Sequence, residues 1–258
     1  MKAAAAQITL SPSKGENLQK AINMIEKAKD SDLVVLPEML MGKRTDETEL
    51  YQLAENVEEG HFAKALALAA KENNITVCAC LWEDSGSERV FNTAVVFSPE
   101  GKLISKYRKL HLFDAFTVKE SDHMLRVESL PPVFNCGGVS CGLSICYDLR
   151  FPEIYRSLVK RGAELFVIPA AWYGGERKVE HMQTLLSARA LENTSYSLIS
   201  NVCGGDFCGN SATFAPFGEM TDNLGDDEGL LTCDISLKYL KQVRKTLPCL
   251  VNFRDDIL

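Results

Sequence analysis

The chain has 258 residues, of which 46% are hydrophobic and 24% are charged, the balance of a globular protein that buries a large core. Acidic residues outnumber basic residues by 35 to 28, and no Lys/Arg-rich block occurs, so we expect no nucleic-acid partner. Gln7 interrupts the apolar start too early for a signal peptide, and the longest uncharged window (129–147) is broken by Pro and Gly. We therefore expect a cytoplasmic protein with no membrane partner.

Predicted strands and helices alternate from the start of the chain. A strand over residues 2–10 comes first, followed by a helix with one buried stripe, formed by Leu18, Ala21, Ile22, Ile25 and Ala28. The apolar run 33–36 predicts a second strand, which Pro37 ends because proline has no amide hydrogen to donate to a neighbouring strand. A helix over about residues 62–73 and a strand over residues 75–81 follow.

The middle of the chain predicts a hairpin and another buried strand. Residues 90–97 and 102–107 flank the segment Ser98-Pro-Glu-Gly, in which Pro at the second position and Gly at the fourth favour a turn. Residues 139–146 read as a buried strand, and Pro152 lies where the first turn of a helix tolerates proline.

The last third of the chain continues this alternation. We expect strands and a helix to follow one another, with a turn before the final strand that closes the sheet: strand 165–169, helix 181–193, strands 195–202 and 211–215, turn 216–219 and strand 230–235. Continuous apolar strands suggest sheets covered on both faces, while the hairpins argue against a purely parallel β/α repeat. Without a linker, repeat or low-complexity tract, one layered α/β domain over residues 1–258 is expected.

Three positions place a reactive side chain directly after a predicted strand: Glu38, Lys109 and Cys146. Active sites of α/β proteins gather at such strand ends. Taken singly, each residue has an ordinary structural role, as a turn carboxylate, a solvated ammonium or a core thiol. Cys146 differs, because a turn between a strand and the helix begun by Pro152 presents its thiol to free backbone amides and a helix N-terminus. That environment stabilises a thiolate and can bind an oxyanion.

The chain contains nine cysteines. Without a secretory signal we expect them to be reduced, and each packs by default as a small hydrophobic residue. None of the closely spaced cysteines has the Cys-x2-Cys spacing of zinc sites, so no metal site is expected. Eight of the nine are therefore assigned to packing.

Together and in this order, the three positions resemble the motifs of the nitrilase (carbon–nitrogen hydrolase) superfamily. The matching segments are Leu-Pro-Glu38-Met, Tyr-Arg-Lys109-Leu-His-Leu-Phe and Ile-Cys146-Tyr-Asp-Leu-Arg-Phe-Pro-Glu, with further agreement at 91–94, 169–172, 187–193 and 216–219. The resemblance covers essentially the whole chain. It implies a four-layer α-β-β-α sandwich with two sheets packed face to face, a homodimer, and no metal or organic cofactor.

The resemblance also implies roles for these residues. A free thiol is only slightly ionised at neutral pH, so Glu38 acts as the general base that takes the Cys146 proton. The thiolate attacks an amide carbonyl, and Lys109 and the backbone amide of Tyr147 stabilise the oxyanion. Ammonia leaves, and Glu38 then activates water to hydrolyse the thioester.

Many members of the superfamily have a second Glu that orients the Lys. Glu120 is our choice for it, with Asp114 and Glu128 as alternatives in the same region. His111 and His181 invite a Cys–His mechanism, but the Cys-Gly-Ser/Ala-Cys context of papain-like enzymes is absent. His111 is therefore expected to be a structural hydrogen-bonding partner.

The residues after Cys146 are similar to those of omega-amidases and deaminated-glutathione amidases. The resemblance implies a small primary amide with a carboxylate at its far end as the partner molecule. Arg108 and Arg150 are candidate cations for that carboxylate. For Asp148, Arg150 and Glu153, however, a local ion pair that braces the turn after Cys146 is favoured over contact with the substrate. Trp172 would instead narrow the pocket toward an apolar acyl group. A general aliphatic or amino-acid amidase and a catalytically silent binding protein on this fold remain alternatives.

Overall fold

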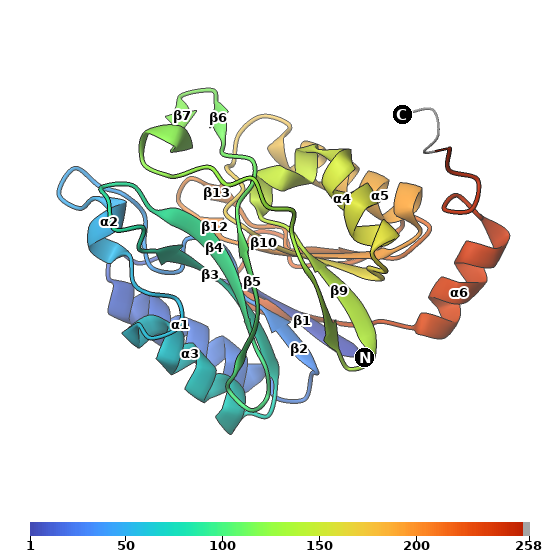
Figure 1. Cartoon of the computed structure of the whole chain (residues 1–258), viewed down its shortest axis with the longest axis horizontal. Helices are drawn as coiled ribbons and strands as arrows, with labels where there is room; N and C mark the ends of the chain where they lie inside the picture. The colour runs from blue at the N-terminus through green and yellow to red at the C-terminus, as the bar shows by residue number, and fades with distance from the viewer. Residues whose placement is uncertain (255–258) are drawn as a thin grey trace.

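The structure, a computed structural model, describes residues 1–254. Two six-stranded sheets lie between two layers of helices (Figure 1). Helices α1 (Lys14–Lys27) and α3 (His61–Glu72) cover the first sheet, and α4 (Pro152–Lys160) and α5 (Lys178–Asn193) cover the second. The predicted four-layer α-β-β-α sandwich is therefore confirmed.

The first sheet is mixed. Its three neighbouring strands β1, β2 and β3 run parallel, and the strands on either side of them pair antiparallel. The order across the sheet is β16 (Gly229–Asp234), β1 (Lys2–Gln7), β2 (Leu33–Val35), β3 (Thr76–Glu83), β4 (Phe91–Phe97) and β5 (Leu103–Arg108).

The second sheet has a similar plan, with three parallel strands, β9, β10 and β11, between antiparallel neighbours. Its order is β15 (Met220–Asn223), β14 (Ala212–Phe214), β11 (Tyr196–Asn201), β10 (Leu165–Ala170), β9 (Val139–Leu143) and β8 (Val133–Cys136). The remaining elements are short: α2 (Leu50–Leu53), β6 (Asp114–Ala115), β7 (Val118–Lys119), η1 (Glu120–Asp122), η2 (Cys146–Arg150), β12 (Cys203–Gly204) and β13 (Phe207–Cys208).

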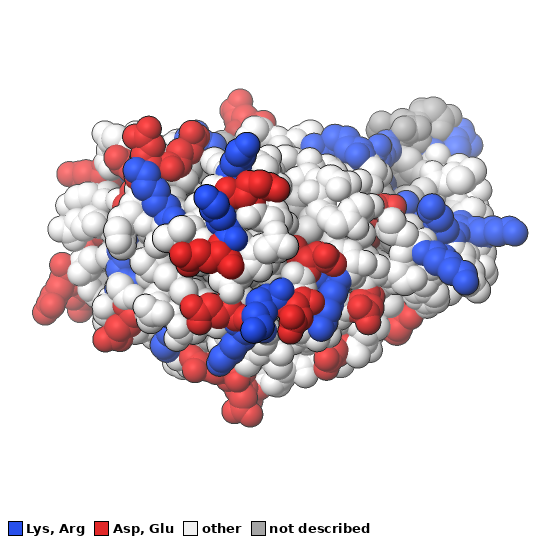
Figure 2. Space-filling view, turned by 90° about the horizontal axis from the view of Figure 1, so that it is seen from below, with Lys and Arg blue, Asp and Glu red and all other residues white. Residues whose placement is uncertain are grey.

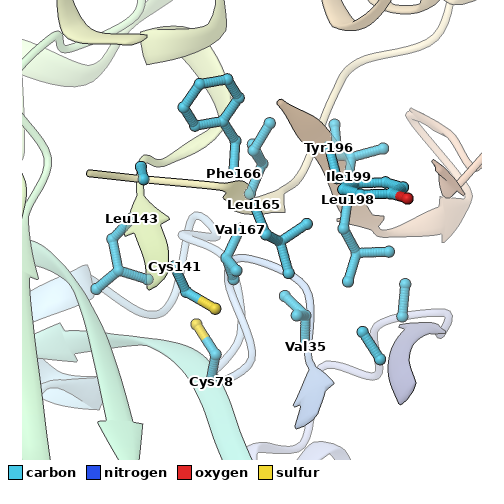
Figure 3. Packing of buried hydrophobic residues seen from close by; sticks show 14 of the residues in the cluster. Val35, Cys78, Cys141, Leu143, Leu165, Phe166, Val167, Tyr196, Leu198 and Ile199 are labelled. Carbon is cyan, nitrogen blue, oxygen red and sulfur yellow. The ribbon is translucent and has the colours of Figure 1, made fainter. Parts of the chain in front are cut away.

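The hydrophobic core lies between the sheets and continues beneath each helical layer. Successive side chains of a strand point to opposite faces, so Ala3 and Ala5 of β1 face the second sheet while Ala4 and Ala6 face α1 and α3. Figure 3 shows Cys78 of the first sheet opposite Cys141 of the second. Because both faces of the central strands are covered, these strands have the continuous apolar sequences noted above.

The predicted helices and strands all occur, with some differences at their ends and in their partners. The predicted strand 139–146 is too long, because β9 ends at Leu143 and the short 3-10 helix η2 begins at Cys146. The two last predicted strands do not close one sheet: β14 belongs to the second sheet, whereas β16 pairs with β1 in the first. Helix α6 (Leu237–Thr246) was not predicted.

Charged side chains of both signs cover the outside of the molecule. Figure 2 shows them mixed over most of the face that it presents, with basic side chains gathered toward the end formed by α6. Within residues 1–254, no helix is both long and apolar enough to span a bilayer.

Candidate active site

A buried ammonium group lies between two buried carboxylates. Lys109 Nζ is 3.0 Å from Glu38 Oε1 and 2.9 Å from Glu120 Oε1, and the three side chains are 1%, 1% and 7% exposed. Burial alone would lower the pKa of Lys109, but the charges of Glu120 and Glu38 outweigh it and hold this pKa well above its usual range. Burial, followed by the charge of Glu38, raises the pKa of Glu120 against the effect of Lys109. Lys109 therefore stays protonated in the site.

Glu38 is held by contacts from both sheets. It follows β2 of the first sheet, and its Oε1 accepts a hydrogen bond from Asn92 Nδ2 on β4 at 2.6 Å. Its Oε2 accepts from the backbone amide of Ala171 at 2.8 Å, directly after β10 of the second sheet. The Glu38 amide itself donates to the carbonyl of Ala170. The carboxylate is thus fixed at the junction of the two sheets, with both oxygens oriented.

Of the three candidates for the second carboxylate, the structure brings one into contact with Lys109. Glu120 opens η1, and its Oε2 accepts from the Phe113 amide at 2.8 Å while Oε1 contacts Lys109. Asp114 instead accepts from the Ser121 amide and is exposed, as is Glu128. Among the three, only Glu120 reaches the ammonium.

Cys146 is the first residue of η2 and has a φ of +42°, a left-handed backbone that is rare for a residue with a side chain. Such a conformation costs on the order of 1–3 kcal/mol and persists where the surroundings impose it, often at functional sites. Helix α4 begins six residues later in the chain, at Pro152, so the thiol does not lie at the start of that helix as expected.

The Cys146 thiol is buried, and its ionisation is disfavoured. Burial and then the charge of Glu38 raise the pKa of Cys146 well above its usual range, against the opposing effects of Lys109 and the Ala171 amide. The expectation that the turn by itself stabilises a thiolate is therefore wrong. Because its pKa is raised, this cysteine needs a nearby base to become a nucleophile.

Asp148 holds the turn that carries Cys146. Its Oδ2 accepts from the Tyr107 hydroxyl at 2.8 Å and from the Ile145 amide at 3.0 Å. Its Oδ1 lies 3.1 Å from the His111 amide and 2.9 Å from His111 Nδ1, whose ring stacks on Phe151. His111 is thus a structural partner, as predicted.

The expected local ion pair of Arg150 with Asp148 or Glu153 is wrong. The Asp148 carboxylate is fully buried and its contacts go to neutral donors and His111, whereas Glu153 is exposed on α4. The Arg150 guanidinium lies 4.9 Å from the centre of the Trp172 ring. Arg150 is directed to the pocket, away from the turn's internal contacts.

Replacing Asp148 with Asn should lower the free energy of unfolding by about 2–3 kcal/mol. The amides of Ile145 and His111 and the hydroxyl of Tyr107 all donate to Asp148, so the amide nitrogen of Asn would face a donor. Urea denaturation measures the change, with the exposed Asp30→Asn as the matched control. A loss below about 0.5 kcal/mol would mean that other contacts hold the turn.

One pocket is lined by three of the candidate catalytic residues, while Lys109 lies behind its wall in contact with Glu38 and Glu120. Glu38, Glu120 and Cys146 lie in it, and the empty space amounts to about 370 Å³, including the open mouth. The other lining residues are Met39, Phe113, Tyr147, Arg150, Ala171, Trp172, Tyr173 and Lys178. The side chain of Tyr147 forms part of the wall, while the oxyanion role of its backbone amide stays a prediction. His181 lies on α5 and is not among the lining residues.

Sequence reasoning missed Lys178, the first residue of α5. A cation is disfavoured at a helix N-terminus by the helix dipole, and Arg150 lines the same pocket. Burial, and then the charge of Arg150, lowers the pKa of Lys178. Within residues 1–254, no carboxylate forms a salt bridge with either cation. The only signal in the sequence was its place directly after the loop that follows β10, another strand end.

Comparison with known families matches the carbon-nitrogen hydrolase family over residues 2–245. The chain belongs to the carbon-nitrogen hydrolase family. This carbon–nitrogen hydrolase is 33% identical over 256 residues to the deaminated glutathione amidase of Escherichia coli O157:H7, covering 98% of this chain and 97% of that protein. It is 33% identical over 249 residues to the 2-oxoglutaramate amidase of Bacillus subtilis (strain 168), with coverages of 94% and 93%.

A solved structure has the same fold. It is a variant of the amidase from Nesterenkonia sp. AN1 with acrylamide added to its active-site cysteine, and it superposes with a TM-score of 0.82 at 29% identity, covering 96% of this chain and 98% of that one. The amidase relatives confirm the family branch that the sequence indicated. This carbon–nitrogen hydrolase acts on amides.

Proposed function

We propose that this hydrolase releases ammonia from a small primary amide that carries a carboxylate at its far end, through a thioester on Cys146. The observation that carries this proposal is the pair of cations, Arg150 and Lys178, that lines the same pocket as Cys146 and Glu38. Two like charges with no carboxylate partner in residues 1–254 favour an anionic ligand.

The first half of the reaction forms the thioester. Glu38 takes the proton of Cys146, and the sulfur attacks the amide carbonyl carbon. The oxyanion that develops is stabilised by the Lys109 ammonium and the Tyr147 backbone amide. When the tetrahedral intermediate collapses, the carbon–nitrogen bond breaks, Glu38 returns its proton to the leaving nitrogen, and ammonia departs.

The second half reverses these roles. Glu38 takes a proton from water, whose oxygen attacks the thioester, and the carbon–sulfur bond breaks as the Cys146 thiolate regains the proton. Glu120 does not touch the reacting atoms in this scheme. Together with Glu38 it holds the Lys109 ammonium, which keeps the oxyanion donor charged and in place.

The choice of substrate class has two further supports. The 2-oxoglutaramate amidase relative is named for an amide that carries a carboxylate. Arg108, the other candidate cation, forms a two-pronged ion pair with Glu83, at 2.8 Å for each contact, and does not line the pocket. Arg150 and Lys178 are thus the two pocket cations to assign to the substrate carboxylate.

A substrate panel tests the proposal. Ammonia release should be measured from succinamate, propionamide, an amino-acid amide and a matched nitrile. Preference for succinamate supports the carboxylated-amide assignment. Faster turnover of propionamide or of the amino-acid amide would instead indicate a general aliphatic or amino-acid amidase. Preference for the nitrile would show that the enzyme does not act mainly on amides, and would overturn the proposal.

Replacing Lys178 with Met should reduce kcat/KM for succinamate by about 10- to 100-fold, the loss expected for one charged hydrogen bond to a carboxylate. Propionamide offers no carboxylate, so its kcat/KM should change far less. Steady-state ammonia release measures both values. Lys27→Met, on the exposed end of α1, removes the same charge away from the pocket and serves as the control. Equal losses for the two amides would contradict the assignment.

A further inference from the structure

The hairpin of β6 and β7 carries an aromatic residue in an unfavourable position. Phe116 follows β6 at the tip of the hairpin, is 78% exposed and has a φ of +58°. Two-residue hairpin turns that need a positive φ are dominated by Gly, Asn and Asp, and a bulky residue there is strained. Strain combined with an exposed apolar ring points to a role for the side chain outside the hairpin.

The ring of Phe116 contacts the pocket cation. Lys178 Nζ lies 3.7 Å from the centre of the Phe116 ring and 5.8 Å from that of Phe113, both within the range of a cation–π interaction. The two rings are themselves 6.2 Å apart. A residue of the hairpin therefore holds the ammonium at the start of α5, a segment about sixty positions further along the chain.

Lys178 lies where two hollows meet. One is the pocket described above, which Cys146 also lines and which we call the inner pocket. The other, the outer hollow, is lined by Lys178 and Phe116. Phe113 and Tyr173 also line both hollows, so the outer hollow adjoins the inner pocket. Asp206, the acidic residue of the outer hollow, contacts Lys43 at 2.8 Å.

We propose that Phe116 is a positioning residue for substrate selection: its ring holds the Lys178 ammonium where the outer hollow adjoins the inner pocket, so that Lys178 and Arg150 together receive the carboxylate of the acyl group. This inference rests on the proposed function and adds a selectivity determinant to it. A Lys side chain has many rotamers, and Arg150 and the dipole of α5 both repel its charge toward solvent. Holding the ammonium in advance removes the cost of ordering it when the substrate binds.

The test compares Phe116→Leu with the wild-type enzyme on succinamate and propionamide. Leucine keeps an apolar side chain but has no π face, so the ratio of kcat/KM for succinamate to that for propionamide should fall by about three- to tenfold. The loss should be in KM for succinamate. Phe116→Tyr keeps the π face and should therefore retain the wild-type ratio. Phe217→Leu, a half-exposed aromatic on the turn between β14 and β15, should keep the wild-type ratio as well.

A second readout does not depend on turnover. Calorimetric titration with succinate should show weaker binding to Phe116→Leu than to the wild-type enzyme, by the same factor. An unchanged ratio and unchanged succinate binding, in a wild-type enzyme that does prefer succinamate, would overturn the role of Phe116 and leave the proposed function intact. A wild-type enzyme without preference for succinamate would overturn both. Equal losses for both amides would also overturn the proposal, because they indicate a general structural role.

Discussion

Alanine in place of Cys146 should reduce ammonia release by at least about 10⁴-fold, to the background of the assay. Without the sulfur no thioester forms, and binding and oxyanion contacts alone do not split the amide efficiently. Ammonia release at saturating amide measures the loss of activity. Intact-mass spectrometry after rapid acid quench should show the acyl adduct on the wild-type chain and none on the variant.

The matched control is Cys80→Ala. Cys80 is buried in β3, and its pKa is raised by burial and by the charge of Glu38, which places its thiol near the same charges as Cys146. It is not among the residues that line the pocket. This variant should still form the acyl adduct. If the adduct persisted in Cys146→Ala and disappeared in Cys80→Ala, the nucleophile would be Cys80 and the assignment to Cys146 would be wrong.

Glutamine in place of Glu38 should lower kcat by about 10²- to 10⁴-fold. The size of the side chain is kept, but the amide of glutamine cannot take the proton of a thiol whose pKa is raised by burial. The geometry is also disturbed, because Asn92 and Lys109 donate to one oxygen and Ala171 donates to the other. Rapid-quench measurements should show that acyl-adduct formation is the step that slows.

Glu83→Gln controls for the loss of a buried carboxylate. Glu83 is 6% exposed, pairs with Arg108 and lies outside the pocket, so its replacement should affect stability more than kcat. Circular dichroism should confirm that both variants are folded. Nearly full activity of Glu38→Gln would assign the base to another group, and Glu120→Gln would be measured next.

That Glu38, Lys109 and Cys146 lie close together could be predicted from the sequence, because each follows a recognisable strand and matches a motif of the family. Glu38, Lys109 and Cys146 follow strands that are recognisable as apolar runs, and parallel or neighbouring strands bring their ends together. Glu120 was chosen among three carboxylates only by its place in the chain. Its contact with Lys109 depends on the short 3-10 helix η1, which cannot be predicted from a periodic pattern in the sequence.

Other features were beyond reach because they depend on tertiary contacts. The left-handed backbone of Cys146 is imposed by the surroundings of the turn, while the apolar residues before it look like a continued strand. Strand β15 is mostly exposed and helix α6 fully buries only Leu240 and Val243, so neither has a strong apolar pattern. Lys178 and Arg150 line the same pocket only because α5 packs beside η2, and this packing is not visible in the sequence.

The pairing of β1 with β16 joins two strands that lie more than 220 positions apart in the sequence. Lys2 of β1 pairs with Asp234 of β16, so one edge of β1 stays unpaired until the chain has been synthesised through β16. All strands of the second sheet lie between residues 133 and 223 and are available earlier. We infer that a chain truncated before β16 exposes an unpaired apolar edge, which is a template for aggregation.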